Sequence, residues 1–323
     1  MFKAEGSKIG LDLNVSKCES ISRSHDHREQ AFQGFLENAP EDACLLGASL
    51  CTGRALDKAL SSRCSDLRIA IGRLKVLPSH DALILLRSSF SVPRLMHTLR
   101  CVPCAEHPSL RVFYNLLQEG ISSITSSHLS DIQWLQDSLP IRDGGLGIRR
   151  ATSLALSAIL ASAASTSDLQ HDILSSCWST PDAEFIGACA SWSAMYSLPC
   201  PADDAAVRQR AWDTPAVARD WLAVWQSAST ETDKARLTAI RAQHSSDWLF
   251  ALPISACDLR LGDEEVSRRL GLNICETHTC PCGANVDMRG LHGLACKCSA
   301  GRSTRHQQLN DLIWRALKRA DIP

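Results

Sequence analysis

The sequence predicts a mainly helical protein with a small β segment near its N-terminus and a cysteine- and histidine-rich segment near its C-terminus. Three observations support this fold class. Apolar residues recur at helical spacing through most of the chain, they alternate with polar residues in residues 9–15, and cysteines cluster convincingly only over residues 275–298. With 323 residues and 45% apolar composition, the chain is long enough to bury a sizeable core.

The β segment is expected in the stretch IGLDLNVSKCE. Ile9, Leu11, Leu13 and Val15 occupy every second position there, which is typical of a half-buried strand. A shorter apolar run, CLLGASLC, follows at residues 44–51.

Helical spacing then takes over. Buried positions are expected at Leu56, Leu60, Cys64, Leu67, Ile71 and Leu74. Pro78 ends this pattern, and Ser79 is expected to cap the helix that follows it. Further helices are predicted around RLMHTLR, SLRVFYNLLQEGISSI and DIQWLQDSL, and from about residue 151 onward.

The stretch LPIRDGGLGIRR, residues 139–150, interrupts the helices. It places one proline and three glycines within eight positions, a composition that permits backbone angles closed to other residues. We interpret it as a connecting turn between two helical regions. Farther along, Trp221, Trp225 and Trp248 occupy core-like positions on amphipathic stretches and are assigned no function.

The chain shows no targeting or membrane signal. Its first ten residues are charged and lack the apolar run of a signal peptide, and the least polar later stretch, residues 151–165, is too short and serine-rich to span a bilayer. We therefore expect an intracellular protein with no membrane partner, in the nucleus or in the cytoplasm. In that setting the 15 cysteines are expected to be small core residues or metal ligands rather than disulfides.

The clustered cysteines have the composition of a zinc site. Cys280 and Cys282 lie in a tight turn, and His292 and Cys296 follow from a later segment. The C-x-C spacing is tighter than usual, and Cys275, His278, Cys298 and His306 are close enough in sequence to replace a ligand. The alternative is a glycine-rich loop with reduced surface thiols, which would be open to oxidation.

A basic segment follows the cluster. Residues 289–319 hold seven Lys and Arg against one acid, Asp311, on a chain with a net charge of −1. This local charge indicates that the segment contacts a polyanion, although a solvated basic surface is the ordinary alternative. The candidate nucleic-acid-binding residues are Lys297, Arg302, Arg305, His306, Arg315, Lys318 and Arg319. Leu309, Ile313, Leu317 and Ala320 form the apolar face by which the final helix is expected to dock.

Three motifs in order resemble one protein family. IGLDLNVSKCE with LLGASL, then SLPIRDGGLGIR, then CPCG-x8-H-x3-C-K-x-S-x-G-R-x2-R-H are similar to the C-terminal part of reverse transcriptases of non-LTR (LINE-like) retrotransposons. These are the reverse transcriptases in which the polymerase is followed by a Cys-Cys-His-Cys zinc knuckle and a restriction-like endonuclease. The resemblance implies Cys280, Cys282, His292 and Cys296 as zinc ligands, and element RNA or target DNA as partner.

The same resemblance implies an order of regions along the chain. It implies a palm remnant over 1–54, a helical thumb-like region over 55–139, a helical connection over 140–252, a zinc-knuckle region over 253–300, and the first helix of a truncated nuclease-like domain over 301–323.

Both active sites of this family are expected to be incomplete. The paired palm aspartates that bind two metal ions do not precede IGLDLNVSKCE. Asp203 and Asp204, in CPADDAA, are better interpreted as a helix N-terminal signal. We therefore expect a non-catalytic fragment that contributes nucleic-acid binding through the zinc knuckle and the adjacent basic helix. The alternatives are a stand-alone zinc-dependent nucleic-acid-binding module and a metal-free helical interaction protein.

Overall fold

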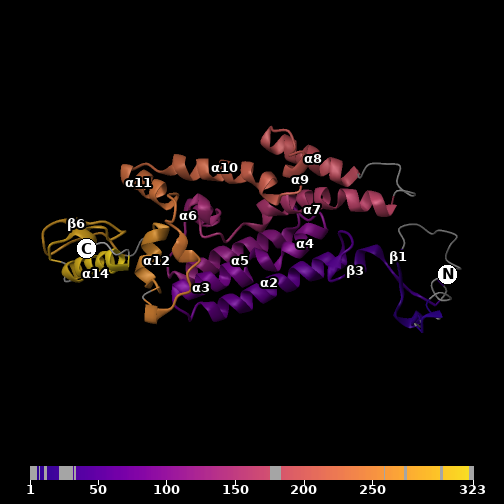
Figure 1. Cartoon of the computed structure of the whole chain (residues 1–323), viewed down its shortest axis with the longest axis horizontal. Helices are drawn as coiled ribbons and strands as arrows, with labels where there is room; N and C mark the ends of the chain where they lie inside the picture. The colour runs from indigo at the N-terminus through magenta and orange to yellow at the C-terminus, as the bar shows by residue number, and fades with distance from the viewer. Residues whose placement is uncertain are drawn as a thin grey trace.

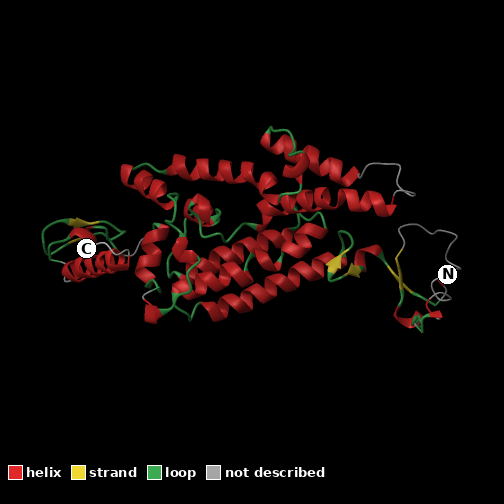
Figure 2. Cartoon of the chain, in the orientation of Figure 1, coloured by secondary structure: helices red, strands yellow, loops and turns green. Residues whose placement is uncertain are grey.

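Helices dominate the computed structural model (Figure 2). The structure describes residues 6, 8–10, 13–21, 32, 34–174, 183–257, 259–272, 275–298 and 301–319. The molecule is elongated, with the N-terminal strands at one end, the C-terminal segment at the other and the long helices between them (Figure 1). Two-stranded sheets hold the strands among these described residues. The predicted mainly α fold class is confirmed.

The N-terminal strand lies later in the chain than predicted. Residues Val15–Lys17 form a 3₁₀ turn, and β1 (Glu19–Ile21) pairs in parallel with β2 (Leu36–Asn38). The expected strand over residues 9–15 is wrong in its described part, because Ile9 is 74% exposed and Leu13 is 42% exposed. Leu11 lies outside the described residues. Alternation gives a half-buried strand only where a sheet partner and a covering layer exist, and the described residues supply neither for these side chains.

The run CLLGASLC forms a tight hairpin. Its strands are β3 (Cys44–Leu45) and β4 (Ala48–Ser49), which pair in antiparallel fashion. Leu46 and Gly47 both have positive φ angles, 51° and 81°, as a two-residue hairpin turn with matching twist requires.

The first long helix confirms the helical pattern. Helix α2 (Arg54–Leu74) buries its apolar stripe, namely Leu56, Leu60, Cys64, Leu67, Ala70 and Leu74. Ile71 is half-buried and lies against α5 (Pro108–Ile124), where a Cβ on Gly120 would come within 2.9 Å of Ile71 Cδ1. A glycine at this point therefore lets the two helices approach closely.

The expected Ser79 cap is wrong. Helix α3 (Ser79–Leu85) has Pro78 as its N-cap residue and runs into a π-helical turn, Leu86–Phe90. Ser79 Oγ donates instead to the Ile124 carbonyl at 2.8 Å, and the Ser79 N–H donates to Asp263 Oδ1 at 2.9 Å. The carboxylate that caps α3 thus comes from the start of α12 (Asp263–Leu270), a pairing that no local sequence rule detects.

The remaining helices follow the predicted series. They are α4 (Met96–Cys101), α6 (Asp131–Asp137), α7 (Ala151–Leu174), α8 (Ala183–Tyr196), α9 (Asp203–Ala206), α10 (Gln209–Ser227) and α11 (Glu231–Ile240). Asp203 and Asp204 occupy the first turn of α9, as expected from their helix-start signal.

Two apolar cores hold these helices together. The larger one joins side chains of residues 56–158 to Leu249, Val266, Leu270 and Leu272, and the smaller one surrounds Trp192 and Trp212. The tryptophan prediction is only partly right. Trp248 is half-buried against the larger core, whereas Trp221 is half-buried beneath the guanidinium of Arg241, which lies 4.3 Å from its ring centroid.

The long helices are not membrane spans. Across the described residues, none combines enough length with enough apolar character to cross a bilayer.

Candidate metal centre

A β-hairpin presents the first two candidate ligands. Strands β5 (His278–Thr279) and β6 (Asn285–Val286) pair in antiparallel fashion, and the turn between them contains Cys280 and Cys282. The Cys280 N–H donates to the Ala284 carbonyl at 2.9 Å, and the Gly283 N–H donates to the Cys280 carbonyl at 2.8 Å. Gly283 has a φ angle of +88°, a conformation that glycine adopts without strain. The turn therefore folds both thiols back toward the same side.

A one-turn helix presents the other two. Helix α13 (His292–Ala295) is followed by Cys296, whose N–H donates to the His292 carbonyl at 2.8 Å. Residues four apart on a helical turn lie on one face, so His292 and Cys296 point in the same direction. Asp287 stabilises the start of this turn, because its Oδ1 accepts a hydrogen bond from the Leu291 N–H at 3.0 Å.

The four side chains converge on one point. The ligand atoms of Cys280, Cys282, His292 and Cys296, called here the Cys/His cluster, all lie within 4.8 Å of one another. Cys280 Sγ and Cys296 Sγ are 3.6 Å apart, and Cys282 Sγ and His292 Nε2 are 3.1 Å apart. A sulfur separation of 3.6 Å is far longer than the ~2.05 Å of a disulfide bond. The cluster could hold a metal ion.

The competing ligands predicted from sequence lie elsewhere. Cys275 Sγ donates to the Asp287 carbonyl at 3.3 Å, and His278 Nδ1 lies 2.9 Å from the Glu276 carbonyl. The thiol of Cys298 is exposed, whereas its backbone N–H donates to Cys296 Sγ at 3.3 Å and lowers the pKa of that thiol. The His306 side chain lies outside the described part of the chain.

An ion pair that sequence reasoning missed anchors the cluster to the helical body. Arg289 Nη1 lies 2.5 Å from Asp233 Oδ1 on α11, and both side chains are mostly buried. Burial opposes ionisation of Asp233, but hydrogen bonds from Thr230 and Arg289 outweigh it and lower the pKa of that carboxyl. Asp233 and Arg289 are 56 positions apart, so no local sequence pattern indicates this pair.

The basic candidates line the segment after the cluster. Lys297 is exposed, and the other six lie on α14 (Gly301–Arg319). Arg315, Lys318 and Arg319 are exposed, while the side chains of Arg302, Arg305 and His306 lie outside the described residues. Arg315 pairs with Asp311 at 3.2 Å, and Lys318 lies 4.2 Å from the Trp314 ring centroid. Both contacts are on the surface and leave these charges available to a partner.

The expected docking of α14 is wrong for its described apolar residues. Ile313 is 47% exposed and Leu317 is 38% exposed, so this face is not buried against the rest of the protein. Leu309 and Ala320 lie outside the described side chains. Amphipathic spacing indicates that a face is apolar, but it does not provide the surface that covers it.

Comparison with protein-family models, with curated proteins and with solved structures gives no match for this chain. The evidence for its function therefore comes from its motifs and from the geometry of its side chains.

Proposed function

We propose that the Cys/His cluster binds one Zn²⁺ and that the ordered segment which results, together with α14, binds the phosphates of a nucleic acid. The observation that carries this proposal is the convergence of three thiols and one imidazole on a hairpin turn and a one-turn helix, directly before a basic helix. The three motifs that resemble non-LTR retrotransposon reverse transcriptases support the same assignment.

Zinc suits this donor set better than a harder cation does. Thiolate and imidazole are its usual ligands in structural sites, with Zn–S distances of about 2.3 Å. Two sulfurs at tetrahedral angles around such an ion are about 3.8 Å apart, close to the 3.6 Å between Cys280 and Cys296. Four protein ligands close the coordination shell, so the zinc has a structural role here and activates no water.

Ordering by zinc prepares the segment for a polyanion. A fixed backbone around Lys297 reduces the entropy lost on binding, and the helix that follows displays further cations alongside it. Contacts with phosphates carry no sequence information, so affinity is expected to vary little with sequence and to fall steeply with salt.

Zinc content tests the first half of the proposal. The full chain, purified under reducing conditions, is expected to contain one zinc per molecule by plasma mass spectrometry. Cys282→Ser and His292→Ala each remove a ligand and are expected to abolish stoichiometric zinc. Cys275→Ser is the matched control, because Cys275 lies outside the cluster, and it should retain the metal. Zinc-free wild-type protein would overturn the assignment in favour of a metal-free interaction protein.

Salt dependence of nucleic-acid binding tests the second half. The double variant Arg302→Gln/Arg305→Gln is expected to weaken binding to a short duplex and to reduce the slope of log K against log salt by about two phosphates' worth. The control is Lys58→Gln/Arg111→Gln, which makes the same charge change on exposed positions of α2 and α5. Equal slopes for these two double variants would show that the basic helix is only a solvated surface.

A further inference from the structure

A second basic site lies about the turn at residues 139–150, called here the glycine turn. A pocket of about 360 Å³ opens between this turn, the start of α10 and the segment before α4. Its lining includes four arginines, Arg87, Arg142, Arg149 and Arg210, and one carboxylate, Asp213. Val92, Pro93 and Met96 supply an apolar wall. The volume lies within the range of pockets that hold small ligands.

The backbone of the glycine turn builds one side of this pocket. Gly144 has a φ angle of +86° and ends the 3₁₀ turn Ile141–Asp143. At Gly145 a Cβ atom would lie 2.1 Å from the Leu139 carbonyl oxygen, so no other residue fits there without a backbone shift. The Gly147 N–H closes the turn by donating to the same carbonyl at 3.0 Å. This tight fold brings Arg142 and Arg149 to one pocket although seven positions separate them in the sequence.

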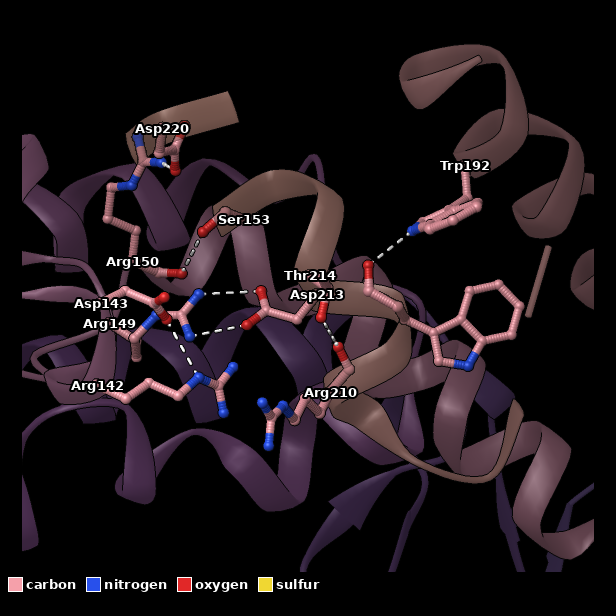
Figure 3. A network of polar contacts seen from close by, with 11 residues as sticks. Arg142, Asp143, Arg149, Arg150, Ser153, Trp192, Arg210, Asp213, Thr214 and Asp220 are labelled. Carbon is pink, nitrogen blue, oxygen red and sulfur yellow. Dashed lines mark hydrogen bonds and ion pairs between the residues drawn. The ribbon is translucent and has the colours of Figure 1, made fainter. Parts of the chain in front are cut away.

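Arg149 is held in place by a buried ion pair. Its Nη1 and Nη2 donate to the two oxygens of Asp213 at 2.8 and 2.9 Å, and Asp213 is 5% exposed (Figure 3). Such a bidentate pair fixes the guanidinium plane. Asp213 is the one carboxylate in the pocket lining. Because it pairs with Arg149, no carboxylate of the lining is left to neutralise the other three arginines.

Arg142 and Arg210 retain most of their donors. Arg142 gives only its Nε to Asp143, at 3.1 Å, and among the described residues Arg210 has no side-chain ion pair or hydrogen bond. In Figure 3 both guanidinium groups lie beneath the Arg149–Asp213 pair, and both residues line the same pocket. Like charges so placed repel one another unless an anion lies between them.

The start of α10 favours an anion at the same place. Arg87 is less available, because its Nη2 donates to the Leu249 carbonyl and its guanidinium lies 5.0 Å from the centroid of the Phe250 ring. The N-cap residue of α10, Arg208, makes no side-chain hydrogen bond to the first turn, and Gln209 and Arg210 of that turn line the pocket. The positive end of a 19-residue helix thus adds to the field of the arginines.

We propose that this pocket binds the phosphate group of a nucleotide unit, either free or within a nucleic-acid strand. Arg142 and Arg210 donate to the phosphate oxygens, Arg149 is a positioning residue held by Asp213, and the apolar wall receives the rest of the nucleotide. Guanidinium groups are the side chains that match phosphate geometry best. The site is independent of the Cys/His cluster and does not require that cluster to hold zinc.

Calorimetric titration of the full chain with pyrophosphate tests the site. Wild-type protein is expected to give saturable binding, which Arg142→Gln and Arg210→Gln each weaken at least about tenfold, since each removes hydrogen bonds to a charged group. Arg111→Gln on α5 is the matched control and should bind as wild type does. Thermal melts without ligand should show Arg210→Gln to be as stable as wild type, because the Arg210 side chain has no ion pair or hydrogen bond with any of the described residues. Absence of saturable binding, or equal loss in Arg111→Gln, would overturn the proposal.

Two further titrations identify the source of the phosphate. With AMP and with a short single-stranded oligonucleotide, the pocket variants should lose affinity for whichever molecule the pocket serves, and loss for either supports the site. Cys282→Ser, which lacks a metal ligand, should keep its affinity for pyrophosphate. A failure of the zinc proposal and a failure of this one are therefore seen in different variants.

Discussion

Asp137 makes the stability of the protein depend on pH. Its side chain is fully buried at the end of α6, and neither carboxylate oxygen has a hydrogen-bond partner among the described residues. Burial raises the pKa of Asp137 to about 8, although the charge of Arg236 acts in the opposite direction. The folded protein therefore keeps this carboxyl protonated at neutral pH, whereas the unfolded chain ionises it near pH 4.

The sign and size of the effect follow from this difference. Between the unfolded pKa of 3.8 and the folded pKa of about 8, the folded state binds one more proton than the unfolded state. Stability is then greatest at the acid end of this window and falls as pH rises, by about 1.4 kcal/mol per unit. From pH 5 to pH 7 the contribution of Asp137 to the free energy of unfolding is expected to fall by about 3 kcal/mol.

Urea unfolding at pH 5, 6 and 7 measures this loss. Asp137→Asn keeps the size of the side chain but cannot ionise. Between pH 5 and pH 7 its free energy of unfolding should therefore fall by about 3 kcal/mol less than that of wild type. Asp66→Asn, on the exposed face of α2, should follow wild type. Every other ionisable group is the same in wild type and Asp137→Asn, so the contributions of those groups cancel in the difference. If wild type and Asp137→Asn lose the same free energy between pH 5 and pH 7, the account of a protonated Asp137 is wrong.

Three further perturbations test other parts of the structure. Gly145→Ala would place a Cβ 2.1 Å from a carbonyl oxygen and should destabilise the protein by at least about 2 kcal/mol in chemical denaturation, whereas Gly187→Ala, in open space on α8, should be neutral or stabilising. Asp213→Asn should cost about 3 kcal/mol in the same assay, since it leaves the charge of Arg149 buried without its partner; a loss below 1 kcal/mol would refute that estimate. Arg289→Gln should leave zinc stoichiometry unchanged while it speeds limited proteolysis between α12 and the Cys/His cluster, and unchanged cleavage would show that the Asp233 pair does not anchor the cluster.

Sequence patterns predicted the parts of the fold that local chemistry determines. The stripe from Leu56 to Leu74 is buried because helical spacing alone places those side chains on one face. The convergence of the four side chains of the Cys/His cluster was predictable for a similar reason, since a glycine-rich turn and an i, i+4 pair bring them together within 17 residues. Asp203 and Asp204 begin a helix as their residue type suggests.

The predictions that were wrong concern residues whose structure depends on partners far away in the sequence. Ser79 has the residue type of an N-cap, but Asp263 from α12 performs that role. Ile9 and Leu13 alternate as a strand does, yet both side chains are exposed. The four arginines of the pocket come from three separate stretches of chain, so the sequence of the glycine turn by itself predicts only a connection.

The larger core also has a consequence for synthesis of the protein on the ribosome. Its buried members come from residues 56–158 and from residues 249–272. The stretch of about ninety residues between them contributes none of the buried members described. A nascent chain therefore displays an unfinished apolar surface on α2 through α5 until Leu270 and Leu272 have left the exit tunnel. During that interval the first amide of α3 also lacks its acceptor, Asp263. Exposed surface of this kind is what chaperones recognise, so release from them is expected only after α12 has been translated.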